Sequence, residues 1–143
     1  MTNINYIKLK NSLKRLEERY KDYKIALTRK ELLISDKESI KESCIQRFEV
    51  CFDTTWKHLK KYLQEEIGLI DIPLGPNPIF KSAFAAKVIN NPTQWIEFNI
   101  RRGNTSHDYS GEKADNTFEI IADFINEAIV LYETMSGEKW ENE

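Results

Sequence analysis

The stretch that decides the fold is residues 36–66, DKESIKESCIQRFEVCFDTTWKHLKKYLQEE. Apolar side chains recur in it at every fourth position, namely Ile40, Cys44, Phe48, Phe52 and Trp56. Further apolar residues widen this stripe, namely Ile45, Leu59, Tyr62 and Leu63. A helix with a wide apolar stripe contacts more than one neighbour. We therefore predict a helix over residues 36–66 at the centre of a helical bundle, with Gly68 as its left-handed C-terminal cap.

The segment before this stretch predicts another long helix. Its apolar residues are spaced three and four apart over three heptads: Tyr6, Leu9, Leu13, Leu16, Tyr20, Tyr23 and Leu27. A repeat of 3.5 residues produces one narrow apolar seam, which suits a helix that packs nearly antiparallel against a neighbour. Ser35 or Asp36 is the expected N-cap of the helix that follows.

Proline and glycine divide the chain after Gly68 into shorter elements. Residues 71–77 are expected to be irregular, and two Asn-Pro pairs at residues 77–78 and 91–92 predict the starts of two short helices. The polar residues 103–116 predict a loop or a frayed helix end. A last helix is predicted from the three-and-four spacing of Phe118, Ile121, Ile125, Ala128, Tyr132 and Met135. The predicted fold class is all-α, an up-and-down four-helix-type bundle whose third element is broken into two short helices.

Length and composition predict one globular domain. The chain has 143 residues, of which 41% are apolar and 31% are charged, the balance of an ordinary folded protein. We expect the bundle to span residues 1–137 and residues 138–143 to form a flexible tail. No export signal and no apolar run of the roughly 18 residues that span a bilayer are present, so we expect a cytoplasmic protein without a membrane partner. Cys44 and Cys51 are seven residues apart, too far to bridge within one helix, and are expected to be core thiols.

Charge is unevenly distributed along the chain, although its net value is −2. Residues 1–30 carry nine basic and three acidic groups, whereas residues 112–143 carry nine acidic groups and two lysines. One interpretation is two solvated helix faces that partly neutralise each other. The other is a basic face that binds an acidic partner or RNA.

Two adjacent arginines differ in their helical position. Arg102 follows Trp95 by seven residues and Phe98 by four, so it continues the apolar side of its helix. A cation on that side must be paired or must serve a function. Arg101 instead falls on the solvent side, where it can pair with Glu97 one turn earlier. This periodicity makes Arg102 the candidate functional arginine.

His107 lies five residues after Arg102 and two before Tyr109, in the polar segment. The other histidine, His58, lies among lysines and is expected at the surface. Histidine transfers protons at neutral pH, and arginine binds phosphate and stabilises charge that develops at phosphorus. In RNA the 2′-hydroxyl is an internal nucleophile, so the reaction requires no metal and no cofactor. One histidine does not easily act as both base and acid, so a homodimer that contributes a second copy would help.

Two points stay open on spacing alone. Arg102 and His107 are equally explained if they bond a nearby helix end or a carboxylate. On the 36–66 helix, Gln46, Glu49 and Asp53 share one side at spacings of three and four. These three residues either orient the arginine or face a partner, or they form a solvated face or ordinary bonds between helices.

The run RGNTSHDY at residues 102–109 resembles the signature of HEPN domains, which is Arg, four residues, His, any residue and Tyr. Residues 46–63, QRFEVCFDTTWKHLKKYL, resemble the second helix of the nucleotidyltransferase substrate-binding-like branch of that family. The resemblance extends in order over nearly the whole chain.

This resemblance implies a homodimer that works with a minimal nucleotidyltransferase in a toxin–antitoxin system. In the toxin members the dimer cleft cuts RNA without a metal. The resemblance assigns Arg102 and His107 as the catalytic pair and Tyr109 as the tyrosine that the nucleotidyltransferase modifies with AMP. Asn104, Ser106 and Arg101 are the expected supports for the phosphate.

The chain departs from the family at Gly103, because many ribonuclease members have a polar residue after the arginine. Two alternatives therefore remain open. One is a non-catalytic subunit that holds a nucleotide or other substrate for the nucleotidyltransferase. The other is a helical scaffold without a site.

Overall fold

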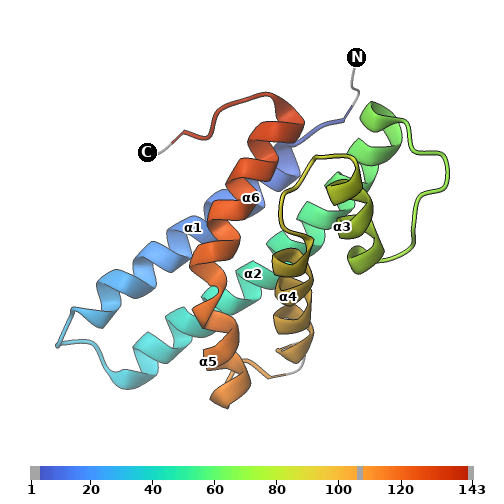
Figure 1. Ribbon diagram of the computed structural model, residues 1–143. Helices are drawn as coiled ribbons and strands as arrows, with labels where there is room; N and C mark the ends of the chain where they lie inside the picture. The colour runs from blue at the N-terminus through green and yellow to red at the C-terminus, as the bar shows by residue number, and fades with distance from the viewer. Residues whose placement is uncertain (1–3, 106–107, 142–143) are drawn as a thin grey trace.

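The structure is a computed structural model that describes residues 4–105 and 108–141. Within these ranges the chain is helical and forms no strand (Figure 1). The elements are α1 (Ile7–Leu27), α2 (Ile34–Tyr62), the π-helix η1 (Leu63–Ile67), α3 (Pro76–Ala85), α4 (Pro92–Asn104), α5 (Gly111–Glu119) and α6 (Ile121–Ser136). The predicted all-helical bundle, with two short helices α3 and α4 as its third part, is confirmed. The predicted start at Asn77–Pro78 is wrong by two residues, because Gly75 is the N-cap of α3 and Pro76 is its first residue.

The two long helices form an antiparallel hairpin, and α6 packs against both of them (Figure 1). The seam of α1 is buried at Leu9, Leu13 and Leu16. Farther along the seam, Tyr20 and Tyr23 contact Phe118 of α5, with ring centroids 5.6 and 4.6 Å apart. The narrow apolar seam therefore lies between α1 and its neighbours as predicted as far as Tyr23, whereas Leu27 at its end is exposed.

Aromatic rings join α2, α3, α4 and α6 in one core. The ring of Phe124 on α6 meets Phe48 of α2 at 5.0 Å and Phe98 of α4 at 5.3 Å, both nearly edge-on. Phe80 of α3 lies 5.3 Å from Trp95 of α4. The edge-to-face pairs of Phe124 favour particular ring orientations. The core therefore sets the rotation of α4 against α2, which in turn decides where Arg102 points.

The ends of α2 differ in part from those predicted. The helix begins at Ile34 with Leu33 as its N-cap, and Asp36 accepts the Leu33 amide at 3.3 Å from inside the first turn. The expectation of Ser35 or Asp36 as the N-cap is therefore wrong by two or three residues. At the other end the turns widen into η1, and Gly68 follows with φ 83°, as predicted for a left-handed cap.

The predicted last helix corresponds to α6, apart from Phe118, which lies on a separate helix α5. The expectation of a loop or frayed helix end is therefore wrong for residues 111–116, and a turn at Ile120 separates α5 from α6. The amide of Ile120 bonds Thr117 rather than continuing the α-helical pattern, at 3.2 Å. Side chains of α5 also bond other elements, because Thr117 donates to the carbonyl of Arg101 and Lys41 of α2 pairs with Asp115. These contacts with α4 and α2 explain why the polar residues after Gly111 form a helix of their own.

His58 is buried, so the expectation that it lies at the surface is wrong. Its Nδ1 lies 2.8 Å from the carbonyl of Thr54 and its Nε2 lies 3.3 Å from the carbonyl of Asn5. The residues just before α1 cross over α2 at this point and cover the imidazole. The surrounding lysines gave no indication of this contact, because it joins positions 53 residues apart.

Residues 138–141 lie against α1 and α6. The ring of Trp140 is 5.5 Å from that of Tyr132, and the Nζ of Lys14 lies 4.6 Å above it. The Trp140 amide also donates to Glu133 at 2.9 Å. The domain limits of 1–137 and the flexibility of 138–143 stay predictions, and residues 142–143 lie outside the described residues.

Both cysteines are buried and unbridged, as predicted. Burial raises the pKa of the Cys51 thiol to about 11.

In residues 4–105 and 108–141, no helix combines the length and the apolar character that a membrane crossing requires.

Candidate functional site

The rotation of α4 is fixed at its start and along its buried side. Asn91 caps the helix by accepting the amide of Gln94 at 3.1 Å, and Pro92 is its first residue. Trp95 and Phe98 are buried in the aromatic core. Arg102 continues this side one turn later and therefore faces α2, as its periodicity indicated.

Arg102 binds two carboxylates of α2. Its Nε and Nη2 donate to the two oxygens of Asp53 at 3.3 and 3.0 Å, and its Nη1 donates to Glu49 at 3.2 Å. Hydrogen bonding to Asp53 raises the pKa of Arg102, so its guanidinium is always charged. Three of the five N–H groups of a guanidinium are thus engaged by described side chains. The Arg102 side chain keeps 26% of its surface exposed, so the group is accessible from solvent.

Glu49 joins Arg102 to two further residues. Its Oε2 also accepts the hydroxyl of Thr105 at 3.2 Å, and its Oε1 accepts the hydroxyl of Tyr109 at 2.7 Å. The bond to Glu49, and secondarily burial, raise the pKa of Tyr109, so its phenol is neutral. We call Glu49, Asp53, Arg102, Thr105 and Tyr109 the Glu49 cluster.

The predicted site residues are only partly joined by this arrangement. Arg102 and Tyr109 meet on the two oxygens of Glu49. Arg101 bonds Glu97 at 2.7 Å, the predicted pair one turn apart, and the carbonyl of Asn116 on α5 at 2.9 Å. The expectation that Arg101 faces solvent is wrong, because its side chain is 25% exposed, about as much as that of Arg102. Asn104 is exposed and lines a cavity of about 600 Å³ with Asp108 and residues 110–113. Ser106 and His107 lie outside the described residues.

Sequence reasoning left two members of the Glu49 cluster undecided and missed a third. Glu49 and Asp53 had the correct spacing, but a solvated face explained that spacing equally well. Thr105 is fully buried. Its position three residues after Arg102, nearly one helical turn, was the feature that could have placed it on the same side as Arg102. Gln46, which shares their spacing, is exposed instead.

The Glu49 cluster combines two carboxylates with one guanidinium, so its formal charge is −1 when both acids are ionised. Glu49 is 6% exposed, and a carboxylate buried to this degree requires a charged partner and hydrogen-bond donors. Arg102, Thr105 and Tyr109 supply them. In the described part of the chain, no group of three His, Cys, Asp or Glu side chains is arranged to hold a metal ion.

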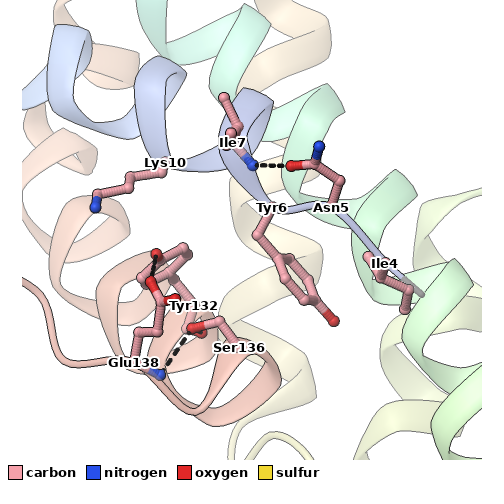
Figure 2. Close-up of a pocket in the computed structure, with 8 residues that line it drawn as sticks. All are labelled: Ile4, Asn5, Tyr6, Ile7, Lys10, Tyr132, Ser136 and Glu138. Carbon is pink, nitrogen blue, oxygen red and sulfur yellow. Dashed lines mark hydrogen bonds between the residues drawn. The ribbon is translucent and has the colours of Figure 1, made fainter. Parts of the chain in front are cut away.

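A second cavity, of about 540 Å³, is lined by α1, α6 and the residues next to them (Figure 2). It is formed where α1 begins and α6 ends, and its lining includes Tyr6, Lys10, Tyr132 and Glu138. The hydroxyl of Tyr132 there donates to Glu138 at 3.0 Å. This cavity shares no lining residue with the Glu49 cluster, and Lys10 is the one cation among its described lining residues. The Glu49 cluster is therefore the better candidate for phosphate chemistry.

Comparison with known proteins gives three findings. The family described as "Nucleotidyltransferase substrate binding protein like" matches residues 4–137. A curated protein of Haemophilus influenzae, "Probable ribonuclease HepT", is 32% identical over 93 residues, which cover 64% of this chain and 64% of that protein. A crystal structure of a protein from Thermus thermophilus has a TM-score of 0.68 and 22% identity, and the match covers 90% of this chain and 96% of the other. At that identity the structural likeness shows the fold alone.

Proposed function

Because the chain belongs to the nucleotidyltransferase substrate-binding-protein-like branch of the HEPN family, we propose that it is a metal-independent endoribonuclease of the toxin–antitoxin type. The observation that carries the proposal is the convergence of Arg102 and Tyr109 on Glu49. This places a permanently charged guanidinium beside the phenol that follows the motif histidine. The name of the Haemophilus influenzae relative, "Probable ribonuclease HepT", supports the same activity.

In the proposed reaction, the 2′-hydroxyl of RNA attacks the adjacent phosphorus and the 5′-oxygen leaves. Arg102 binds the phosphate and offsets the charge that grows on its oxygens. His107 transfers the proton, a role that rests on the Arg-x4-His-x-Tyr motif. A homodimer supplies a second His107, so that one copy acts as base and the other as acid. Asn104, Ser106 and Arg101 support the phosphate from the same segment.

Silencing is proposed to occur at Tyr109. A partner nucleotidyltransferase transfers AMP to its hydroxyl, and the product carries a phosphodiester at an oxygen now 2.7 Å from Glu49. The added adenylyl group brings bulk and negative charge to the position where the RNA phosphate must bind. Both proteins would act in the cytoplasm, where RNA and the nucleoside triphosphate are available.

Substitution of His107 tests the activity directly. We expect His107→Ala to lose growth arrest and to cut RNA about 10²- to 10⁴-fold more slowly in the presence of a chelator, because it lacks the proton-transfer group. His58→Gln is the matched control, since that histidine lies on α2 and contacts the backbone carbonyls of Thr54 and Asn5. Equal cleavage by wild type and His107→Ala would refute the catalytic assignment.

A non-catalytic subunit is the alternative, and two observations favour it. Two carboxylates already bind Arg102, and Gly103 stands where many ribonuclease members have a polar side chain. Such a subunit would bind a nucleotide for its nucleotidyltransferase and leave RNA intact even at high protein concentration. The mass of the Tyr109 peptide from co-expressed protein separates the two functions, because added AMP units support the toxin.

A further inference from the structure

The Glu49 carboxylate bonds both motif residues that the structure describes, Arg102 and Tyr109. Its Oε2 accepts Arg102 and its Oε1 accepts Tyr109, so a single rigid group joins guanidinium and phenol. Glu49 itself is held by the core, because its neighbours Phe48 and Phe52 on α2 are fully buried. The position of this carboxylate is therefore set by α2 and not by the segment that carries the motif.

Asp53 also binds Arg102, but in a different environment. Its side chain is 37% exposed, whereas the Glu49 side chain is 8% exposed. An exposed ion pair is screened by water and contributes little, whereas a buried carboxylate that loses a donor is strongly destabilised. Loss of the Tyr109 hydrogen bond therefore destabilises the Glu49 carboxylate. The bonds of Glu49 that can change to compensate are those to Arg102 and Thr105.

We propose that Glu49 is a positioning residue that orients the Arg102 guanidinium and transmits the chemical state of the Tyr109 hydroxyl to it. The assignment rests on the proposed function, in which Arg102 binds the RNA phosphate. It adds that the arginine adopts its working orientation only while Tyr109 donates to Glu49. Covalent modification of Tyr109 then acts on Arg102 through Glu49, in addition to blocking the RNA.

The modification step removes the donor on which this arrangement depends. The Tyr109 oxygen attacks the α-phosphorus of a nucleoside triphosphate, an O–P bond forms, and pyrophosphate leaves. The phenolic proton passes to Glu49, which already accepts it, and then to solvent. The new phosphodiester has no hydrogen to donate and carries a negative charge beside the carboxylate. Glu49 therefore loses one of its three described donors.

Glu49→Gln is the test variant, because it keeps the shape of the side chain and removes its charge. The matched control is Glu138→Gln, since Glu138 also accepts a tyrosine hydroxyl, that of Tyr132 at 3.0 Å. We expect Glu49→Gln to lower kcat for RNA cleavage about 10- to 100-fold through misorientation of Arg102. Glu138→Gln should cut RNA at the wild-type rate.

Two NMR readouts test Glu49 independently of cleavage. In protein labelled with ¹³C at the tyrosine Cζ, Glu49→Gln should return the raised pKa of Tyr109 towards its ordinary value of 10.0, while Glu138→Gln should leave it in place. In ¹⁵N-labelled protein, Tyr109→Phe should shift the Arg102 Nε signal, and the same substitution should leave that signal unmoved when Glu49→Gln is also present. Such non-additivity is the expected mark of a coupled network.

The results separate this inference from the proposed function. A protein that cuts no RNA but shows the coupled NMR shifts refutes the ribonuclease and supports the link through Glu49. An Arg102 signal that responds to Tyr109→Phe equally with and without Glu49 refutes the link. If Glu49→Gln does not fold, Glu49→Asp serves in its place, because it keeps the charge and withdraws the carboxylate by one methylene. An unchanged Tyr109 pKa in that variant refutes the link as well.

Discussion

At the scale of single residues, hydrogen bonding decides whether a buried polar group lowers the stability of the fold. Glu49 is buried and accepts three described donors, so its charge is compensated. Tyr6 is the opposite case. Its hydroxyl oxygen is shielded from solvent, and no described group bonds it. A buried hydroxyl without a partner lowers stability, because folding removes its bonds to water and replaces none of them.

Tyr6→Phe should therefore stabilise the protein by about 1 kcal/mol at neutral pH. Burial, with nearby Tyr62, Glu66 and Glu65, raises the pKa of Tyr6 to about 12 from 10.0. A raised pKa in the folded state means that stability is complete below pH 10.0 and falls as the pH rises towards about 12. Tyr6→Phe should flatten this alkaline loss. Urea unfolding followed by tryptophan fluorescence at neutral and alkaline pH measures both effects.

Tyr132→Phe is the contrasting variant. The Tyr132 hydroxyl donates to Glu138 at 3.0 Å, so its removal should lower the free energy of unfolding by about 1 kcal/mol. Equal losses from Tyr6→Phe and Tyr132→Phe at neutral pH would contradict the claim that the Tyr6 hydroxyl lacks a partner.

At the scale of elements, two glycines have opposite roles. Gly68 ends η1 with φ 83°, a left-handed conformation in which other residues are strained. Gly103 lies in the last turn of α4 without a positive φ, where glycine costs more conformational entropy than alanine. A Cβ at either position would meet no atom of the described residues within 4 Å, so we expect backbone conformation to decide the effect.

Gly68→Ala should lower the free energy of unfolding by about 1 kcal/mol, and Gly103→Ala should raise it by about 0.5–1 kcal/mol. Thermal unfolding followed by circular dichroism measures both changes. Effects of the same sign would show that the left-handed cap at Gly68 does not govern the end of η1. Gly103→Ala also tests whether a firmer end of α4 alters RNA cleavage.

At the scale of the whole molecule, the segment after α6 connects the last helix to the first. Trp140 packs on Tyr132 of α6 and under Lys14 of α1, and the Nζ of Lys14 donates to the carbonyl of Glu141 at 3.1 Å. These contacts lie away from the Glu49 cluster. They therefore contribute to stability without touching the candidate site.

Trp140→Ala should destabilise the protein by about 2–3 kcal/mol, because it exposes the apolar surface beneath a large buried ring. Lys139→Ala is the control, since that side chain is exposed. Urea unfolding gives the change in stability, and RNA cleavage per folded molecule should stay at the wild-type value. A stability equal to that of Lys139→Ala would mean that residues 138–141 are mobile in solution, as the sequence predicted.

The buried sides of the long helices and the side of α4 on which Arg102 lies follow from the sequence, because both depend on neighbours within two turns of the same helix. The stripe from Ile40 to Trp56 and the spacing from Trp95 to Arg102 needed no knowledge of the rest of the chain. The Asn91–Pro92 start signal is equally local, and the structure confirms it.

Only the tertiary structure decided which groups meet across the bundle. The bond between Tyr109 and Glu49 joins positions 60 residues apart, and the burial of His58 depends on a carbonyl 53 residues away. The same holds for α5, whose polar sequence becomes helical where Thr117 and Asp115 bond α4 and α2. Periodicity reports which side of a helix is buried, but the partner on that side depends on how the helices pack. For this reason the sequence pointed to Arg102 and Tyr109, and the packing of α4 on α2 revealed Glu49 between them.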